Sequence, residues 1–219
     1  MSKLIDVSHT VHDGLITYPG FPGPLVCDFL SREASKAHYD HGTTFHIAKV
    51  EMIANTGTYV DSPFHRFEHG VDLADLPLAS LADLEGLVID ATACADRAVD
   101  PELFESLDLR GKAVLVRTGW DRHWATPAYF SGHPHLTAAT AEVLRTGGAA
   151  LVVIDSLNID NTDGGARPVH TVLLGASIPI VEHACNLGSL PRAGFRFHAV
   201  PVKFRGVGTF PVRAYAVLE

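Results

Sequence analysis

"KAVLVRT" at residues 112–118 and "ALVVID" at residues 150–155 are two short apolar runs rich in valine, and "TAATAEVLR" at residues 137–145 lies between them. The two apolar runs predict strands. The middle segment predicts a helix that Thr137 can cap and that ends before a pair of glycines. A strand, a helix and a strand in this order predict a parallel βαβ unit with a right-handed crossover. This unit indicates an α/β fold.

The segments on either side of this unit are rich in predicted strands. We predict strands at residues 3–7, 46–54, 87–90, 178–182, 195–204 and 212–217, and further helices at residues 78–84 and 101–107. No repeat or linker divides the chain, so we expect one α/β domain with mixed sheets over residues 1–219. Active sites of such folds tend to lie in loops at the carboxyl ends of strands.

Composition excludes several classes of protein. Apolar residues make up 47% of the chain and charged residues 19%, which is typical of a globular protein. The net charge is −8 and no cluster of lysine or arginine is present, so we expect no nucleic-acid or membrane partner. No secretory signal or long apolar segment is visible, and the three cysteines are isolated from one another. We therefore expect a soluble, cytoplasmic protein.

A row of polar residues lies in "ANTGTYVDSPFHRF" at residues 54–67. Asn55, Tyr59, Asp61 and His65 all have odd numbers, so in an extended chain their side chains point to one face. A glycine and a proline between them can bend the segment. The row is either a functional loop or the solvated end of a hairpin.

The same segment resembles the signature of a known family, His-x-Gly-Thr-His-x-Asp-x-Pro-x-His. Gly57, Thr58, Asp61, Pro63 and His65 match this signature in register. "VLVRTGW", "LVVIDSLNID", "VHTVLLGASIPIVE" and "FPVRAYAV" extend the resemblance over nearly the whole chain. The chain is similar to the cyclase family of metal-dependent hydrolases, which includes bacterial kynurenine formamidase and isatin hydrolase. The resemblance implies a swivelling β/β/α domain, which agrees with the predicted mixed sheets.

The resemblance also implies a metal site. Members of the family use a metal, commonly zinc or manganese, to activate water against an amide or lactone carbonyl. By position, Asp61, His170 and Glu182 are the implied metal ligands, and His65 is the implied acid/base group. Three protein ligands with one open position are usual for a catalytic zinc. Without the resemblance, we would interpret His170 as a histidine in a loop and Glu182 as a carboxylate on the surface.

Two positions depart from the signature, because Asn55 and Tyr59 replace its first two histidines. Both are poor substitutes for imidazole ligands, so we expect about one metal ion per chain. Asn55 is either a weak ligand or a group that orients a ligand. Tyr59 either donates a hydrogen bond to an oxyanion or fills the space of the missing histidine. His46 could replace a ligand only if a bulge turned it toward the loop.

Further residues have two interpretations each. Trp120 and Trp124 either form a wall of a substrate pocket or pack in the core. Asp155 and Asp160 fit helix caps and turns better than metal ligands.

We therefore predict a metal-dependent hydrolase of a small amide, lactone or related carbonyl compound. The alternatives are a non-catalytic protein that binds a small ligand and a metal-assisted cyclase or dehydratase. Formylkynurenine is not predicted as the substrate, because the two replaced histidines belong to the signature of kynurenine formamidase. The resemblance also implies a homodimer or a higher homo-oligomer.

Overall fold

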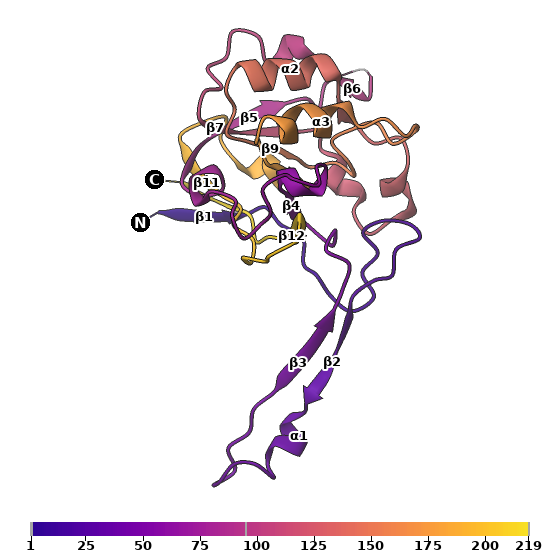
Figure 1. Cartoon of the computed structure of the whole chain (residues 1–219), viewed down its shortest axis with the longest axis vertical. Helices are drawn as coiled ribbons and strands as arrows, with labels where there is room; N and C mark the ends of the chain where they lie inside the picture. The colour runs from indigo at the N-terminus through magenta and orange to yellow at the C-terminus, as the bar shows by residue number, and fades with distance from the viewer. Residues whose placement is uncertain (1, 95, 219) are drawn as a thin grey trace.

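The structure, a computed structural model, describes residues 2–94 and 96–218. A nine-stranded mixed sheet forms its centre (Figure 1). In spatial order the strands are β1 (Lys3–Asp6), β13 (Tyr215–Leu218), β11 (Phe195–His198), β5 (Leu84–Asp90), β7 (Lys112–Arg117), β9 (Leu151–Ile154), β10 (Ile180–Glu182), β4 (Tyr59–Asp61) and β12 (Thr209–Pro211). The four strands β5, β7, β9 and β10 are parallel, and the other pairings in this sheet are antiparallel.

The predicted βαβ unit is confirmed, with α2 (Ala138–Thr146) between β7 and β9. The Thr137 side chain accepts a hydrogen bond from the backbone of Thr140 and caps the helix. Both faces of the parallel strands are buried, which explains their continuous apolar sequence. Val114 belongs to the core beneath α2 and α3 (Pro168–Gly175), and Leu115 belongs to the core on the opposite face.

The two other predicted helices are wrong. Residues 78–84 form one 3₁₀ turn (Leu78–Ser80), since Asp83 has a positive φ of 56° and Leu84 already pairs with Phe197 in the sheet. Residues 101–107 likewise form one turn (Pro101–Leu103), and Ser106 has a positive φ of 65°. One turn gains too few backbone hydrogen bonds to propagate a helix.

Helix α3 was not predicted from the sequence, because a short apolar run does not distinguish a helix from a strand. The strand that pairs with β3 (Ile47–Glu51) was not predicted either; it is β2 (Leu25–Leu30). The strand predicted at residues 195–204 ends at His198. The remaining elements are α1 (Arg32–Ser35), the pair β6 (Ala98–Val99) and β8 (His135–Leu136), and the 3₁₀ turns Pro63–His65, Trp120–His123, Pro127–Phe130 and Leu187–Ser189.

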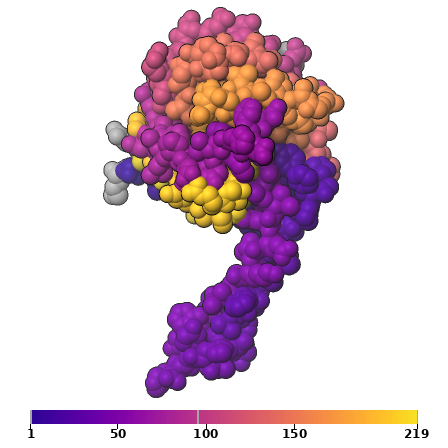
Figure 2. Space-filling view, viewed as in Figure 1, coloured from indigo at the N-terminus to yellow at the C-terminus, as the bar shows by residue number. Residues whose placement is uncertain are grey.

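A long arm, residues 25–51, projects from the body of the molecule (Figures 1 and 2). It consists of the hairpin β2–β3 with α1 at its far end. Its strands carry apolar side chains that are exposed in this chain, with Phe29 at 75% and Val50 at 53%. No helix among residues 2–94 and 96–218 has the length and apolar character needed to cross a bilayer.

Candidate metal centre

Three elements that are distant in sequence converge at one edge of the sheet. Strand β4 runs antiparallel to β10, which places Tyr59 opposite Glu182 and Asp61 opposite Ile180. The first turn of α3 adds His170, and the segment after β9 adds Asp160. The expected row of side chains is confirmed for Tyr59 and Asp61, because both approach residues of this cluster from β4.

Asp61 is fully buried and has one carboxylate oxygen without a partner. Its Oδ1 accepts a hydrogen bond from the Thr209 hydroxyl at 2.5 Å. Its Oδ2 is buried, accepts no hydrogen bond from the described residues and lies 3.7 Å from His170 Nε2. A buried carboxylate oxygen is costly unless it binds a donor or a cation. This unpartnered oxygen therefore fits a metal ligand.

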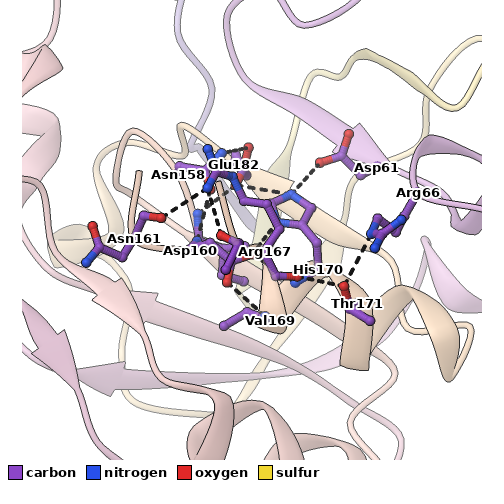
Figure 3. Close-up of polar contacts among 12 residues, drawn as sticks. Asp61, Arg66, Asn158, Asp160, Asn161, Arg167, Val169, His170, Thr171 and Glu182 are labelled. Atoms are coloured by element: carbon purple, nitrogen blue, oxygen red, sulfur yellow. Dashed lines mark hydrogen bonds and ion pairs between the residues drawn. The ribbon is translucent and has the colours of Figure 1, made fainter. Parts of the chain in front are cut away.

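His170 is oriented by Asp160. The Asp160 carboxylate accepts hydrogen bonds from the backbone of Val169 and His170, so it caps α3. It also lies 2.7 Å from His170 Nδ1, which leaves Nε2 facing Asp61 and Glu182 (Figure 3). Histidines that bind metals usually donate their second ring nitrogen to a carboxylate in this way. The expectation that Asp160 is a capping residue is confirmed, and the structure adds this second contact.

Glu182 is buried at the end of β10. Its Oε1 accepts a hydrogen bond from the backbone of Ile159 at 2.6 Å and lies 3.6 Å from His170 Nε2. Burial raises the pKa of Glu182 above its usual value, an effect that nearby His170 opposes. Among the described residues Oε1 accepts this one hydrogen bond and retains a lone pair, so Glu182 can still coordinate a cation through Oε1.

His65 lies at the exposed edge of the cluster, in the 3₁₀ turn after β4. Its Nδ1 is 2.7 Å from the Thr209 hydroxyl. Since this hydroxyl donates its only proton to Asp61, Nδ1 of neutral His65 must be the donor to the hydroxyl oxygen. Nε2 is then unprotonated and can accept a proton or bind a metal. Ligand atoms of Asp61, His65 and His170 lie within 4.8 Å of one another, so the geometry allows either role.

Tyr59 stands at a position where the family signature has a histidine. Its hydroxyl donates to Glu182 Oε2 at 2.6 Å and lies 2.8 Å from the Tyr18 hydroxyl. Burial first, and then the charge of Glu182, raise the pKa of Tyr59 well above 10. The phenol therefore stays protonated, and its proton is engaged by Glu182. This geometry supports the expectation that Tyr59 occupies the space of the missing histidine.

Other candidates lie apart from the cluster. Asn55 is half-buried before β4, and its side chain makes no hydrogen bond to the described residues. His46 lies in the arm and contacts Asp28 at 2.8 Å. Trp120 donates to the backbone carbonyl of Tyr129, and Trp124 stacks on a histidine near the N-terminus. The structure does not bring these residues together with Asp61.

The sequence did not reveal the roles of Thr209, Tyr18 and Asn158. Asn158 Nδ2 lies 3.2 Å from the Tyr18 hydroxyl, beside Glu182. A threonine directly before "FPVRAYAV" was the one available signal for Thr209, because it adjoins a segment that matches the family.

We expect the metal-free protein to lose stability as the pH rises from 7 toward 10. Burial lowers the pKa of His170, but Asp160, Asp61 and Glu182 outweigh burial and raise it from 6.5 to about 10. The protonated folded state is favoured most below pH 6.5, and this stabilisation disappears as the pH passes through the folded-state pKa. The free energy of unfolding can fall by as much as about 1.4 kcal/mol per pH unit in this interval.

Urea unfolding of the metal-free protein at several pH values measures this slope. The matched control is metal-free His170→Gln, whose free energy of unfolding should change much less over the same interval. A flat profile for the wild-type protein would show that the carboxylates do not hold a proton on His170.

Comparison with known proteins places the chain in a family. The family model described as "Putative cyclase" matches residues 5–161. A kynurenine formamidase of Bacillus cereus is 27% identical over 214 residues, which cover 97% of this chain and 96% of the relative. A kynurenine formamidase of Salinibacter ruber is 28% identical over 216 residues, which cover 96% and 95%. The chain belongs to the cyclase family.

Solved structures agree in fold. Isatin hydrolase A from Labrenzia aggregata, bound to benzyl benzoate, matches with a TM-score of 0.84 at 20% identity, covering 99% of this chain and 94% of that chain. Isatin hydrolase A from Ralstonia solanacearum matches with a TM-score of 0.83 at 20% identity, covering 100% and 92%. This likeness confirms the expected α/β class with a swivelling β/β/α arrangement.

Proposed function

We propose that the protein is a metal-dependent hydrolase that cleaves an amide, a lactone or a related carbonyl group of a small molecule. The unpartnered Oδ2 of Asp61, which faces His170 Nε2 beside Glu182, carries this proposal. The activities named for the relatives, kynurenine formamidase and isatin hydrolase, support the amide class of substrate. We also propose that residues 1–219 form one domain, because β1 and β13 pair the two ends of the chain in one sheet.

Asp61, His170 and Glu182 would hold the metal, for which we propose zinc or manganese. Two carboxylates and one imidazole suit both ions. When bound, such an ion supplies Lewis acidity to water and to the carbonyl oxygen. His65 accepts a proton from the attacking water through Nε2 and donates it to the leaving group. The hydrogen bond with the Thr209 hydroxyl orients the His65 ring. Tyr59 keeps Glu182 in position through its hydrogen bond.

The direct experiment measures hydrolysis of formanilide, a simple lactone and isatin by three samples of the protein. One sample is stripped with a chelator, one is reloaded with zinc and one with manganese. We expect turnover only in the reloaded samples. If neither ion supports turnover of any carbonyl compound, the protein is not a hydrolase of this class and the alternative of a ligand-binding protein takes its place.

We predict about one tightly bound metal ion per chain. Tyr59 and Tyr18 fill the region beside Glu182 with two protonated phenols, whose pKa values burial raises well above 10. Metal content after dialysis measures the ratio directly. The double substitution Asn55→His and Tyr59→His restores the family signature and should raise the ratio toward two. Two ions per chain in the wild-type protein would contradict the prediction.

We propose that the protein forms a homodimer or a higher homo-oligomer. An isolated two-stranded hairpin is only marginally stable in water, yet the arm exposes Phe29, Ile47 and Val50 on its strands. A second copy of the chain can cover these side chains. Sedimentation equilibrium measures the mass, and replacing these three residues by threonine should shift the protein toward the monomer.

A further inference from the structure

Two arginines line a small cavity at the candidate metal centre. The cavity has a volume of about 120 Å³ and is lined by His65, Arg66, Asn158, Arg167 and His170. Pockets that hold a whole drug-sized ligand usually measure about 300–1,000 Å³. This cavity therefore suits one functional group of a substrate, next to the residues that would hold the metal.

Arg167 is held in place by the loop before α3. Its Nη1 donates to the carbonyl oxygens of Asn161, Gly164 and Ala166 at 3.2, 2.7 and 2.7 Å. These three contacts use one nitrogen, and no carboxylate among the described residues binds the other guanidinium donors. Because Arg167 directly precedes Pro168 at the start of α3, it lies close in sequence to His170.

Arg66 reaches the same helix from the other side. Its Nε donates to the Thr171 hydroxyl at 3.2 Å, which ties the segment after β4 to α3. In Figure 3, Arg66 and Arg167 lie on opposite sides of the His170 ring. Their guanidinium groups therefore flank the imidazole from two separate segments of the chain.

Neither guanidinium is neutralised by the protein. Within residues 2–94 and 96–218, no carboxylate forms an ion pair with Arg66 or Arg167, whereas Arg97 and Arg117 each have one. The nearby carboxylate of Asp160 is already engaged by His170 and the backbone.

With a divalent metal ion bound, the net charge of the site favours the binding of an anion. Asp61, Asp160 and Glu182 bring three negative charges, and a divalent ion with the two guanidiniums brings four positive charges. With neutral histidines, one positive charge is left in a partly enclosed site, where an electrostatic interaction is stronger than in open water.

We propose that Arg66 and Arg167 bind a carboxylate group of the substrate, so that the enzyme selects anionic amides or lactones over neutral ones. The planar guanidinium matches a carboxylate in charge and in geometry. This inference rests on the proposed hydrolase function for the identity of the reacting group. The binding of a carboxylate can nevertheless be measured without any turnover.

The first experiment measures binding of benzoate and benzamide to the zinc-loaded protein by calorimetry. We expect benzoate to bind at least about 10-fold more tightly, and this preference to weaken with salt. Arg66→Gln and Arg167→Gln should each weaken benzoate binding about 10-fold and leave benzamide binding unchanged. Arg167→Lys should recover part of the loss, because it keeps the charge without the planar fork. Arg110→Gln, at an exposed position before β7, is the matched control.

Benzoate affinity that is the same in both glutamine variants as in the wild type would overturn the inference, because the carboxylate would then bind to the metal alone. Thermal melts establish that each variant is folded.

The second experiment compares a formanilide that carries a ring carboxylate with its uncharged carboxamide counterpart. Arg66→Gln should raise KM about 10-fold for the carboxylate substrate with little change in kcat, and should not change KM for the carboxamide. Turnover of both substrates with equal kcat/KM would overturn the inference and leave the hydrolase function standing. Benzoate binding that depends on the arginines, without turnover of any substrate, would support the inference and contradict the hydrolase function.

Discussion

Glu182→Gln should lose the tightly bound metal and with it nearly all hydrolysis. The substitution removes an anionic ligand from a centre with three proposed protein ligands. Loss of a group that only orients a ligand usually costs 10–100-fold in metal affinity, so loss of a ligand should cost more than about 100-fold. Glutamine is preferred over alanine, because it keeps the size of the side chain. Its carbonyl oxygen can still accept one of the two hydrogen bonds that Glu182 receives, from Tyr59 or from the backbone of Ile159. Asp61→Asn should have the same effect.

Metal content after dialysis and turnover at saturating zinc are the two measurements. Asp155→Asn is the matched control, because Asp155 is also a buried carboxylate at this edge of the sheet. Its oxygens accept hydrogen bonds from Thr118 and Gly119, outside the cluster. This control should retain the metal. Full metal occupancy in both Glu182→Gln and Asp61→Asn would refute the proposed ligands.

His65→Gln should keep the metal and bind substrate nearly normally, but its turnover should fall by about 10²–10⁴-fold. This is the usual effect of removing a positioned proton-transfer group. Thr209→Val should reproduce part of the loss, because it removes the hydroxyl that contacts both Asp61 and His65. Thr209→Ser keeps the hydroxyl and should therefore retain normal turnover. Single-turnover kinetics with metal-loaded protein separate the chemical step from binding.

His69→Gln is the control for this experiment, because His69 is exposed in the same loop. It should leave turnover unchanged. Release of the metal by His65→Gln would make His65 a ligand, which the 4.8 Å cluster of Asp61, His65 and His170 also allows. His65 would then not be the acid/base group.

Local features of this protein follow from the sequence alone. The β7–α2–β9 unit was predictable because two valine-rich apolar runs flank a helical segment that begins at a capping threonine and ends at a pair of glycines. Tyr59 and Asp61 were predictable as neighbours on one face because they are two residues apart on an extended strand. The resemblance to the family along the rest of the chain then related Asp61 to His170 and Glu182, which no local pattern connects.

Only the tertiary structure shows how these side chains meet. The pairing of β4 with β10 places Tyr59 beside Glu182, although 123 residues separate them along the chain. Because of this pairing, the Tyr59 hydroxyl donates its hydrogen bond to the Glu182 carboxylate.

Helix α3 was missed, and a helix was wrongly predicted over residues 78–84, for a related reason. In short apolar segments, contacts with the rest of the sheet outweigh local propensity, so the sequence is compatible with more than one structure. Arg167 acquires its place at the cavity in the same way, because α3 and the loop before it carry its guanidinium to the side of His170. The sequence determined which chemical groups are available, and the long-range packing of β4, β10 and α3 decided which of them face one another, because hydrogen bonds and charges act over a few ångströms and not along the chain.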